Sequence, residues 1–262
     1  MVIDYTNCIR DAPNSEHWDL KNYQDIPNSE TVRTSFKTPS SQRPRWQAFN
    51  QTNSRNRTQK VCSLEFQIPN NLDPPVFLYY RLTNFYQNHR RYVKSVDERQ
   101  LQGEAVALSA LRSSDACSPL ITDPEVEKPY FPCGLIANSL FNDTFEDPLM
   151  TNSVGGSQNK TYHMTDKGIA WTSDKDRYKQ TKYRPDEVVP PPNWREQYGD
   201  KYTDKNPPPD LSQREDFQVW MRTAGLPTFS KLARRNTTAK MEKGTYTVNI
   251  VDRKFLEEWW VR

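Results

Sequence analysis

The sequence has few glycines and no long hydrophobic run. Eight glycines in 262 residues leave little room for a Gly-rich phosphate loop, and no GxSxG or EF-hand pattern is present. The longest apolar stretch, around residues 76–80, is only a few residues long, whereas a bilayer-spanning helix needs about 20 apolar residues. No signal-peptide pattern follows Met1. We therefore expect either a cytosolic protein or a chain that lacks its targeting segment.

Aliphatic side chains are also scarce. Leu, Ile, Val and Phe make up just under a fifth of the chain, a level that indicates disorder when the net charge is high. Here the net charge is only +3, and aromatic residues reach 12%. Disordered chains lack such side chains, each of which buries a large apolar area. Twenty prolines, which avoid helix interiors and central strands, complete the pattern. The composition predicts a folded protein with an aromatic core and long irregular loops.

Recognisable sites for metals, cofactors, nucleic acid or catalysis are absent from the sequence. With 36 basic and 33 acidic residues, the charge gives no reason to expect nucleic-acid binding. The histidines, His17, His89 and His163, do not have the spacing of a zinc site. The acidic pairs at 215–216 and 257–258 could serve a glycosidase, which needs two facing carboxylates. Adjacent carboxylates more often decorate a solvated surface, so we expect no enzyme and no cofactor.

Two clusters of basic residues and one aromatic pair have no assigned role at this stage. The basic clusters are His89–Arg91 and Arg234–Arg235, and the aromatic pair is Trp259–Trp260. A phosphate site at a basic cluster is conceivable, but ion pairing on the surface or between domains is the more common role of such residues. We expect ion pairs at the clusters, and a packing or interface role for the tryptophans.

The four cysteines are Cys8, Cys62, Cys117 and Cys133, and no two of them have the CxxC spacing of a zinc or redox site. An even number fits two disulfides with three possible pairings. We favour the sequential pairing, Cys8 with Cys62 and Cys117 with Cys133. Four unpaired buried thiols are the alternative.

Five Asn-x-Ser/Thr sequons favour the disulfides over free thiols. Sequons matter only on surfaces made in the secretory pathway. Together with the even cysteine count, they suggest a lumenal or extracellular domain. The sequon asparagines are Asn50, Asn56, Asn142, Asn159 and Asn236.

Alternating apolar residues predict a β core. Cys62–Ile68 alternates strictly, which is typical of a half-buried strand, and Thr245–Ile250 alternates again. Val76–Leu82 is bulky on both faces, which predicts a central strand. Two neighbouring strands of this type indicate an antiparallel sheet. The first 60 residues are polar and loop-like, with isolated aromatic anchors such as Trp18 and Trp46.

One helix is indicated after Ser212. Ser212 and Glu215 have capping-box spacing, and Phe217, Trp220 and Met221 then share one helical face. Gly225 and Pro227 are expected to end this helix. Short helical turns are expected within 97–130 and 146–165. The proline-rich stretches 188–192 and 206–210 suggest extended spacers.

Several long motifs together resemble one family. Asn84–Val93 reads NFYQNHRRYV, Tyr130–Phe145 reads YFPCGLIANSLFNDTF, and Glu215–Ala224 reads EDFQVWMRTA. These motifs resemble the accessory (beta) subunits of type IV P-type ATPases, the phospholipid flippases, whose members carry ligand-effect-modulator and cell-division-control names. The resemblance covers roughly Ile3 to Ile250 and is closest to fungal members.

The resemblance implies a fold and a function. Members have two transmembrane helices flanking one exoplasmic ectodomain, and this chain is similar to that ectodomain. The implied fold is β-rich: an antiparallel β-sandwich-like core with long irregular extensions, a few short helices and disulfide staples. Members are not catalytic. They support the folding of the ATPase, its exit from the endoplasmic reticulum and its transport cycle.

Individual sites follow from the same resemblance. It implies a disulfide between Cys117 and Cys133, which leaves Cys8 and Cys62 for the other. Asn142 matches the family's glycosylation position and Asn236 falls near another. The expected organisation is a single ectodomain over 1–250 on the exoplasmic or lumenal side, and a divergent or truncated segment over 251–262. The expected partners are the ATPase, the membrane through helices outside this chain, and N-linked glycans. A secreted carbohydrate-binding module is the alternative.

Overall fold

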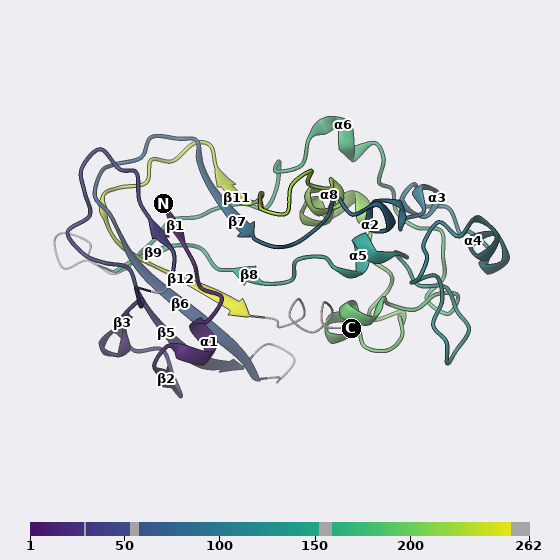
Figure 1. The fold of residues 1–262 in the computed structure, drawn as a ribbon, viewed down its shortest axis with the longest axis horizontal. Helices are drawn as coiled ribbons and strands as arrows, with labels where there is room; N and C mark the ends of the chain where they lie inside the picture. The colour runs from purple at the N-terminus through teal and green to yellow at the C-terminus, as the bar shows by residue number, and fades with distance from the viewer. Residues whose placement is uncertain (29, 53–57, 152–158, 253–262) are drawn as a thin grey trace. The chain divides into compact units, whose positions relative to one another are not determined.

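The computed structural model describes residues 1–28, 30–52, 58–151 and 159–252 (Figure 1). The chain forms two compact units, each assembled from segments far apart in the sequence. The first unit comprises Met1–Phe77, Asn142–Thr165 and the described residues from Arg235 onward. The second comprises Leu78–Phe141 and Asp166–Arg234. The expected β-rich fold with a few short helices and two disulfides is confirmed, and its described strands form several sheets.

The first unit is built on a mostly antiparallel sheet (Figure 1). Its three long strands pair in the order β12, β6, β5. Shorter strands extend it, and among the described strand pairs of this sheet only β2 and β5 run parallel. The strands are β2 (Asn14–Ser15), β3 (Gln24–Asp25), β5 (Arg45–Thr52), β6 (Thr58–Ile68), β8 (Thr144–Phe145), β9 (Leu149–Met150), β10 (Lys160–Thr161) and β12 (Gly244–Asp252).

The remaining short elements of this unit lie near its start. β1 (Val2–Ile3) pairs antiparallel with β4 (Val32–Arg33). Helix α1 (Cys8–Asp11) contacts β5 and β6, and η1 (Leu20–Asn22) is a single 3₁₀ turn.

Strand β6 matches the alternating pattern seen in the sequence, but it is covered on both faces. Cys62 and Leu64 are buried on one face, and Val61 and Ser63 on the other. The strand is therefore buried on both faces rather than half-buried, and it is central in the sheet because β12 pairs with Lys60–Ile68 and β5 with Thr58–Glu65. The expected return of the chain to the sheet at 245–250 is confirmed by β12.

Two expectations about the strand regions are wrong. β7 (Val76–Leu82) is not central, because its sheet has only one other strand, β11 (Phe229–Asn236), and Phe77 and Tyr79 are 44% and 55% exposed. β7 also does not pair with β6. The described parts of 146–165 form strands β9 and β10 rather than helical turns.

The second unit consists of short helices, loops and strand residues (Figure 1), and its core is rich in aromatic side chains. The ring centroids of Trp194 and Phe217 lie 5.7 Å apart, edge to face, and those of Phe131 and Tyr183 lie 5.6 Å apart. The helices are α2 (Arg90–Lys94), α3 (Glu98–Leu101), α4 (Leu108–Ser114), α5 (Leu135–Asn138), α6 (Thr172–Lys175), η2 (Pro192–Trp194), α7 (Arg195–Tyr198), η3 (Leu211–Gln213) and α8 (Glu215–Met221). The helical turns expected within 97–130 are present as α3 and α4.

Helix α8 exists, but the expected capping box does not. The Ser212 hydroxyl donates to the Asp210 carboxylate instead, and the residue before α8 makes no side-chain cap. Phe217 and Trp220 are buried as expected. The helix ends at Met221, before Gly225 and Pro227, and the Lys231 ammonium donates to the carbonyls of its last turn.

The stretch at 188–192 is not a spacer. Val188, Val189 and the two prolines after them are buried, and Val189 bridges to Tyr130. This segment therefore belongs to the core of the second unit.

Candidate functional site

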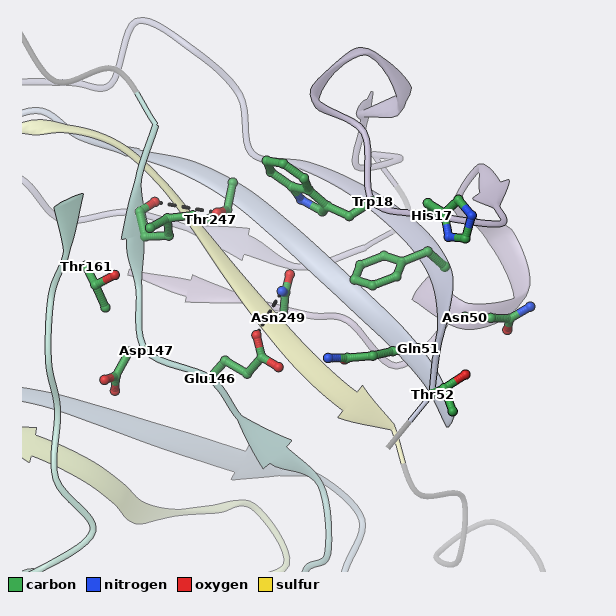
Figure 2. A pocket seen from close by; sticks show the side chains of 12 residues that line it. His17, Trp18, Asn50, Gln51, Thr52, Glu146, Asp147, Thr161, Thr247 and Asn249 are labelled. Atoms are coloured by element: carbon green, nitrogen blue, oxygen red, sulfur yellow. Dashed lines mark hydrogen bonds between the residues drawn. The ribbon is translucent and has the colours of Figure 1, made fainter. Parts of the chain in front are cut away.

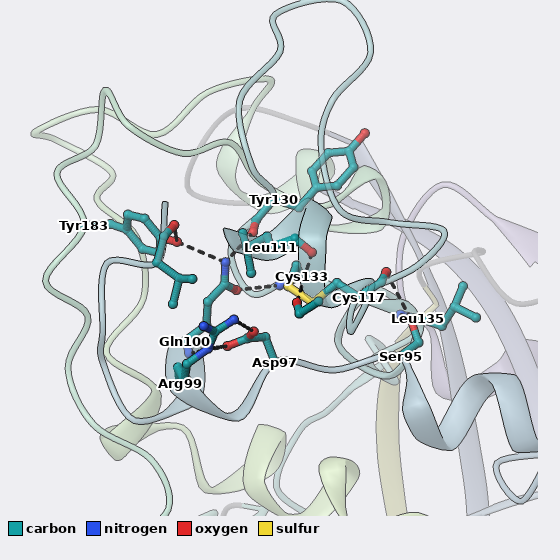
Figure 3. Close-up of a disulfide and its surroundings, with 12 residues drawn as sticks. Ser95, Asp97, Arg99, Gln100, Leu111, Cys117, Tyr130, Cys133, Leu135 and Tyr183 are labelled. Carbon is teal, nitrogen blue, oxygen red and sulfur yellow. Dashed lines mark hydrogen bonds and ion pairs between the residues drawn. A yellow bond between two sulfur atoms is a disulfide. The ribbon is translucent and has the colours of Figure 1, made fainter. Parts of the chain in front are cut away.

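The disulfide between Cys117 and Cys133 lies in a buried polar setting in the second unit (Figure 3). The Cα atoms are 5.6 Å apart. Gln100, 1% exposed, donates to the Tyr130 carbonyl and the Tyr183 hydroxyl, each at 3.2 Å, and accepts from the Cys133 N–H at 3.0 Å. One amide side chain thus joins α3 to the cysteine segment and to Tyr183.

Ser95 forms a second connection at the same disulfide (Figure 3). Its hydroxyl donates to the Cys117 carbonyl at 3.2 Å and accepts from the Leu135 N–H at 2.8 Å. Between them, Gly134 has φ 97° and ψ 168°, a region that essentially only glycine occupies. A Cβ atom there would lie 2.7 Å from the Ser95 carbonyl carbon. The Pro-Cys-Gly motif at 132–134 therefore needs glycine at its third position, because a side chain there would strain the backbone and collide with Ser95.

The disulfide between Cys8 and Cys62 ties helix α1 to the central strand β6. Its Cα atoms are 5.9 Å apart, and both residues are fully buried. The bond closes 54 residues of sequence, against 16 for the other disulfide. Cys8 and Cys62 belong to the first unit and Cys117 and Cys133 to the second, so each unit has one disulfide of its own.

The sequon asparagines occupy different settings in the first unit. Asn50, on β5, and Asn159, before β10, are exposed, whereas Asn142 is half-buried. Asn236 ends β11, where its amide nitrogen donates to the His163 carbonyl at 2.7 Å and its oxygen accepts from the Ala239 N–H at 2.7 Å. Asn56 lies outside the described residues.

A pocket of about 730 Å³ opens on one face of the main sheet (Figure 2). Gln51 points toward Glu146, whereas Asn50 points to the other side of β5 (Figure 2). The lining residues are His17, Trp18, Phe49, Asn50, Gln51, Thr52, Glu146, Asp147, Leu149, Thr161, Thr247 and Asn249.

A chain of hydrogen bonds runs along this face of the sheet. The Trp18 indole donates to the Tyr23 hydroxyl at 3.1 Å, and Tyr23 and Ser63 bond at 2.6 Å. Ser63 donates to Asn249 at 2.6 Å, so Tyr23 is the donor to Ser63. Asn249 donates to the Glu146 carboxylate at 2.9 Å. Both hydroxyls are committed to this chain, and burial raises the pKa of Tyr23. These hydrogen bonds stabilise this face of the sheet, and they do not prepare the Tyr23 or Ser63 hydroxyl to act as a nucleophile.

The carboxylates weighed as catalytic pairs are engaged in ion pairs. Glu215 bonds the Lys175 ammonium at 2.8 Å, and Asp216 pairs with Arg214 at 2.7 Å. Burial alone would raise the pKa of Glu215, but bonds from Lys175 and from the Ala170 backbone outweigh it and lower that pKa to about 2. The acidic pair at 257–258 and the tryptophans at 259–260 lie outside the described residues.

The histidines do not assemble a metal site in the described part of the chain, where no group of three metal-binding side chains occurs. Of the basic clusters, Arg90 and Arg91 are exposed and make no ion pair within the described ranges, contrary to expectation. The pocket and the Gln100 network could not be found in the sequence.

Comparison with known proteins identifies relatives. The chain is 42% identical over 250 residues to the phospholipid-transporting ATPase accessory subunit CRF1 of Saccharomyces cerevisiae, covering 95% of this chain and 59% of that protein. It is 42% identical over 264 residues to the accessory subunit CDC50 of Chaetomium thermophilum, covering 95% and 62%. For the human cell cycle control protein 50B, the identity is 40% over 206 residues, covering 72% and 55%.

The chain thus spans about three-fifths of the length of these fungal relatives. None of the described helices combines the length and apolar character needed to cross a bilayer. The comparisons give no support to a carbohydrate-binding module. A sequence model described as the LEM3 (ligand-effect modulator 3) family / CDC50 family matches residues 1–258, and the chain belongs to this family.

Proposed function

We propose that this chain is the ectodomain of a non-catalytic accessory subunit of a phospholipid-translocating type IV P-type ATPase. The observation that carries the proposal is the 42% identity, over 95% of the chain, to proteins named as accessory subunits of such ATPases. In this role the ATPase hydrolyses ATP and moves lipid. The accessory subunit forms a heterodimer with it and supports its folding, its export from the endoplasmic reticulum and its transport cycle.

The proposed location is the exoplasmic or lumenal side of the endoplasmic reticulum, Golgi, endosomal or plasma membrane. Two disulfides support this, because such bonds persist in oxidising compartments. We propose N-linked glycans at the five sequon asparagines. We also propose that residues 1–250 act as one ectodomain, that 251–262 form a divergent terminal segment, and that transmembrane helices outside this chain hold the protein in the membrane.

Loss of the full-length protein from its host tests the proposal. At least one type IV ATPase should then stay in the endoplasmic reticulum, because its folding and export depend on the accessory subunit. Its N-glycans, or a reporter fused to it, should stay in the form typical of that compartment. Re-expression of the protein should restore export. Normal localisation of every such ATPase in the deleted host would contradict the proposal.

A further inference from the structure

The pocket on the main sheet of the first unit combines aromatic rings with polar groups (Figure 2). Trp18 and Phe49 supply the rings, and Gln51 and Asn249 supply amides near the Glu146 carboxylate. Its volume of about 730 Å³ lies within the usual range of ligand sites, about 300–1,000 Å³. None of the residues that line it in the described part of the chain is a lysine or an arginine. The lining thus lacks the cations that usually bind phosphate, and its chemistry suits a neutral ligand rich in hydroxyl groups.

The Trp18 ring is fixed before any ligand binds. Its indole N–H donates to the Tyr23 hydroxyl at 3.1 Å, so the ring cannot turn without breaking a hydrogen bond. It packs against the buried cluster of Phe49, Val61 and Val251, yet it stays half-buried. A fixed ring loses little conformational entropy when a ligand packs on it. Trp18 therefore offers a ready apolar surface for the C–H face of a sugar ring.

Polar side chains of the pocket keep hydrogen-bonding capacity for a ligand. The Glu146 carboxylate accepts from the Asn249 amide at 2.9 Å and makes no ion pair with a described residue. A carboxylate has about four acceptor sites, so other sites remain. The exposed Gln51 side chain points toward Glu146 (Figure 2) and makes no hydrogen bond with a described side chain. These groups can accept from and donate to sugar hydroxyls.

A sequon lies at the rim of this pocket. It consists of Asn159, Lys160 and Thr161, and Thr161 itself lines the pocket. Side chains two residues apart along a strand point to the same face of the sheet, and Asn159 stands two residues before Thr161, at the start of β10. Asn159 is exposed, and its side chain makes no hydrogen bond within the described ranges. A glycan on Asn159 therefore begins beside the pocket, on the face where the pocket opens.

The pocket is within reach of that glycan. β10 pairs with β9, and β9 pairs with β12, which carries Asn249. Two strand spacings, about 10 Å, thus separate β10 from β12, a length that two linked sugar rings cover. The other sequon asparagine at the pocket is Asn50, whose side chain points to the other side of β5 (Figure 2). A glycan on Asn50 leads away from the pocket.

We propose that this pocket binds the core of the N-linked glycan on Asn159. The two N-acetylglucosamine rings would lie against Trp18, and their hydroxyl and acetamido groups would bond to Gln51 and Glu146. The ligand is thus a sugar attached to the chain itself. Attachment favours binding, because a tethered ligand has an effective concentration in about the millimolar range. The inference goes beyond the proposed function and needs only the proposed lumenal or exoplasmic location and the glycan.

Deglycosylation of the folded full-length protein, followed at each sequon by mass spectrometry, tests the proposal. The protein is made with high-mannose glycans and treated with endoglycosidase H, which cleaves between the two N-acetylglucosamine rings. Asn50 is the internal control, because its side chain points away from the pocket. Cleavage at Asn159 should be at least about tenfold slower than at Asn50, which corresponds to about 1.4 kcal/mol in favour of the bound glycan. In the denatured protein both sites should be cleaved at the same rate.

A variant that fills the pocket should remove this protection. Gln51→Trp places a large ring in the pocket from an exposed position. Its matched control is Lys243→Trp, at an exposed residue of the same unit that does not line the pocket. Unchanged thermal midpoints should first show that both variants fold. Gln51→Trp should then raise the cleavage rate at Asn159 to that at Asn50, whereas Lys243→Trp should leave the ratio of the two rates unchanged.

An added sugar gives a second measurement that leaves the pocket wall intact. Asn159→Gln removes the tethered glycan, so N,N′-diacetylchitobiose at millimolar concentration should bind to this variant. Saturation-transfer NMR detects that binding. The same sugar should be excluded from the wild type and from Asn50→Gln, because the glycan on Asn159 occupies their pocket. Equal binding to all three proteins, or no binding to Asn159→Gln, would contradict the proposal.

The outcomes separate this inference from the proposed function. Equal cleavage rates at Asn159 and Asn50 in the folded wild type, no glycan on Asn159, or protection that persists in Gln51→Trp would each overturn the inference. The proposed function stands in those cases if the protein still binds a type IV ATPase. A protein that binds no such ATPase but shows a protected Asn159 glycan would refute the proposed function and support the glycan-binding pocket.

Discussion

Replacing Gly134 with alanine tests the close backbone approach beside the Cys117–Cys133 disulfide. The new methyl group would meet the Ser95 backbone, with 2.7 Å to its carbonyl carbon. Real Cβ contacts under 3.0 Å are essentially never seen, and the obstacle is main chain rather than a flexible side chain. Ser95 or the Cys133–Leu135 segment must therefore move.

The expected cost has two parts. An alanine at φ 97° and ψ 168° is strained by about 1–3 kcal/mol. Displacing Ser95 also weakens its bonds to the Cys117 carbonyl and the Leu135 N–H, each of which contributes about 1 kcal/mol. We expect Gly134→Ala to lower the free energy of unfolding by about 3–5 kcal/mol in total.

Two other glycines separate these parts. Gly199 has φ 81° and ψ −174°, the same backbone region, but no atom lies within 4 Å of a Cβ built there. Gly199→Ala should therefore cost only the strain, about 1–3 kcal/mol. Gly225 has open space and no positive φ, so Gly225→Ala should change stability by less than about 1 kcal/mol.

The assay is urea unfolding of the oxidised 262-residue chain, followed by tryptophan fluorescence. Mass spectrometry should first show that both disulfides are intact in each variant. The account predicts the order Gly134→Ala, Gly199→Ala, Gly225→Ala from the largest loss to the smallest. A loss for Gly134→Ala no larger than that for Gly199→Ala would refute the close contact with Ser95.

Three further predictions concern the disulfides, one ion pair and one sequon. Replacing Cys8 and Cys62 together with serine should lower the free energy of unfolding by about 4 kcal/mol, whereas replacing Cys117 and Cys133 should lower it by about 3 kcal/mol, because the Cys8–Cys62 bond closes the longer loop. Equal losses in urea unfolding would contradict this. Folding lowers the pKa of Glu215 from 4.5 to about 2, so the ionised carboxylate stabilises the folded state fully above pH 4.5, and this contribution is lost as the pH falls toward 2. The free energy of unfolding of the wild type should exceed that of Glu215→Gln by about 1–2 kcal/mol at pH 6, since Lys175 is 39% exposed, and the gap should narrow as the pH falls from 4.5 toward 2; a gap independent of pH would refute it. Asn50→Gln should remove one glycan from the secreted chain, seen as a mobility shift that peptide-N-glycosidase abolishes, and unchanged mobility would contradict occupancy.

The central strands could be predicted from the sequence, whereas their neighbour could not. β6 and β12 show apolar residues at every second position because one face of each strand packs in the apolar core, whereas the opposite face, although also buried in β6, carries polar residues such as Ser63. β5 lacks that signal, because its inward residues include Gln47, which is fully buried yet polar. Its oxygen accepts from the Asp19 N–H at 3.4 Å, a partner 28 residues away that no local pattern reveals.

The start of α8 shows the same limit. Ser212 and Glu215 have the spacing of a reciprocal cap, but each has a stronger partner elsewhere. Asp210 accepts from the Ser212 hydroxyl at 2.6 Å, and Lys175 bonds the Glu215 carboxylate across 40 residues of sequence.

Co-purification tests the central claim most directly. The full-length protein, tagged and isolated from its host membranes in mild detergent, should carry a type IV P-type ATPase in near-equal amount. An exposed-surface control, such as the Val126→Ser protein, should carry the same amount. Failure to recover any such ATPase from membranes that contain the correctly disulfide-bonded protein would contradict the account.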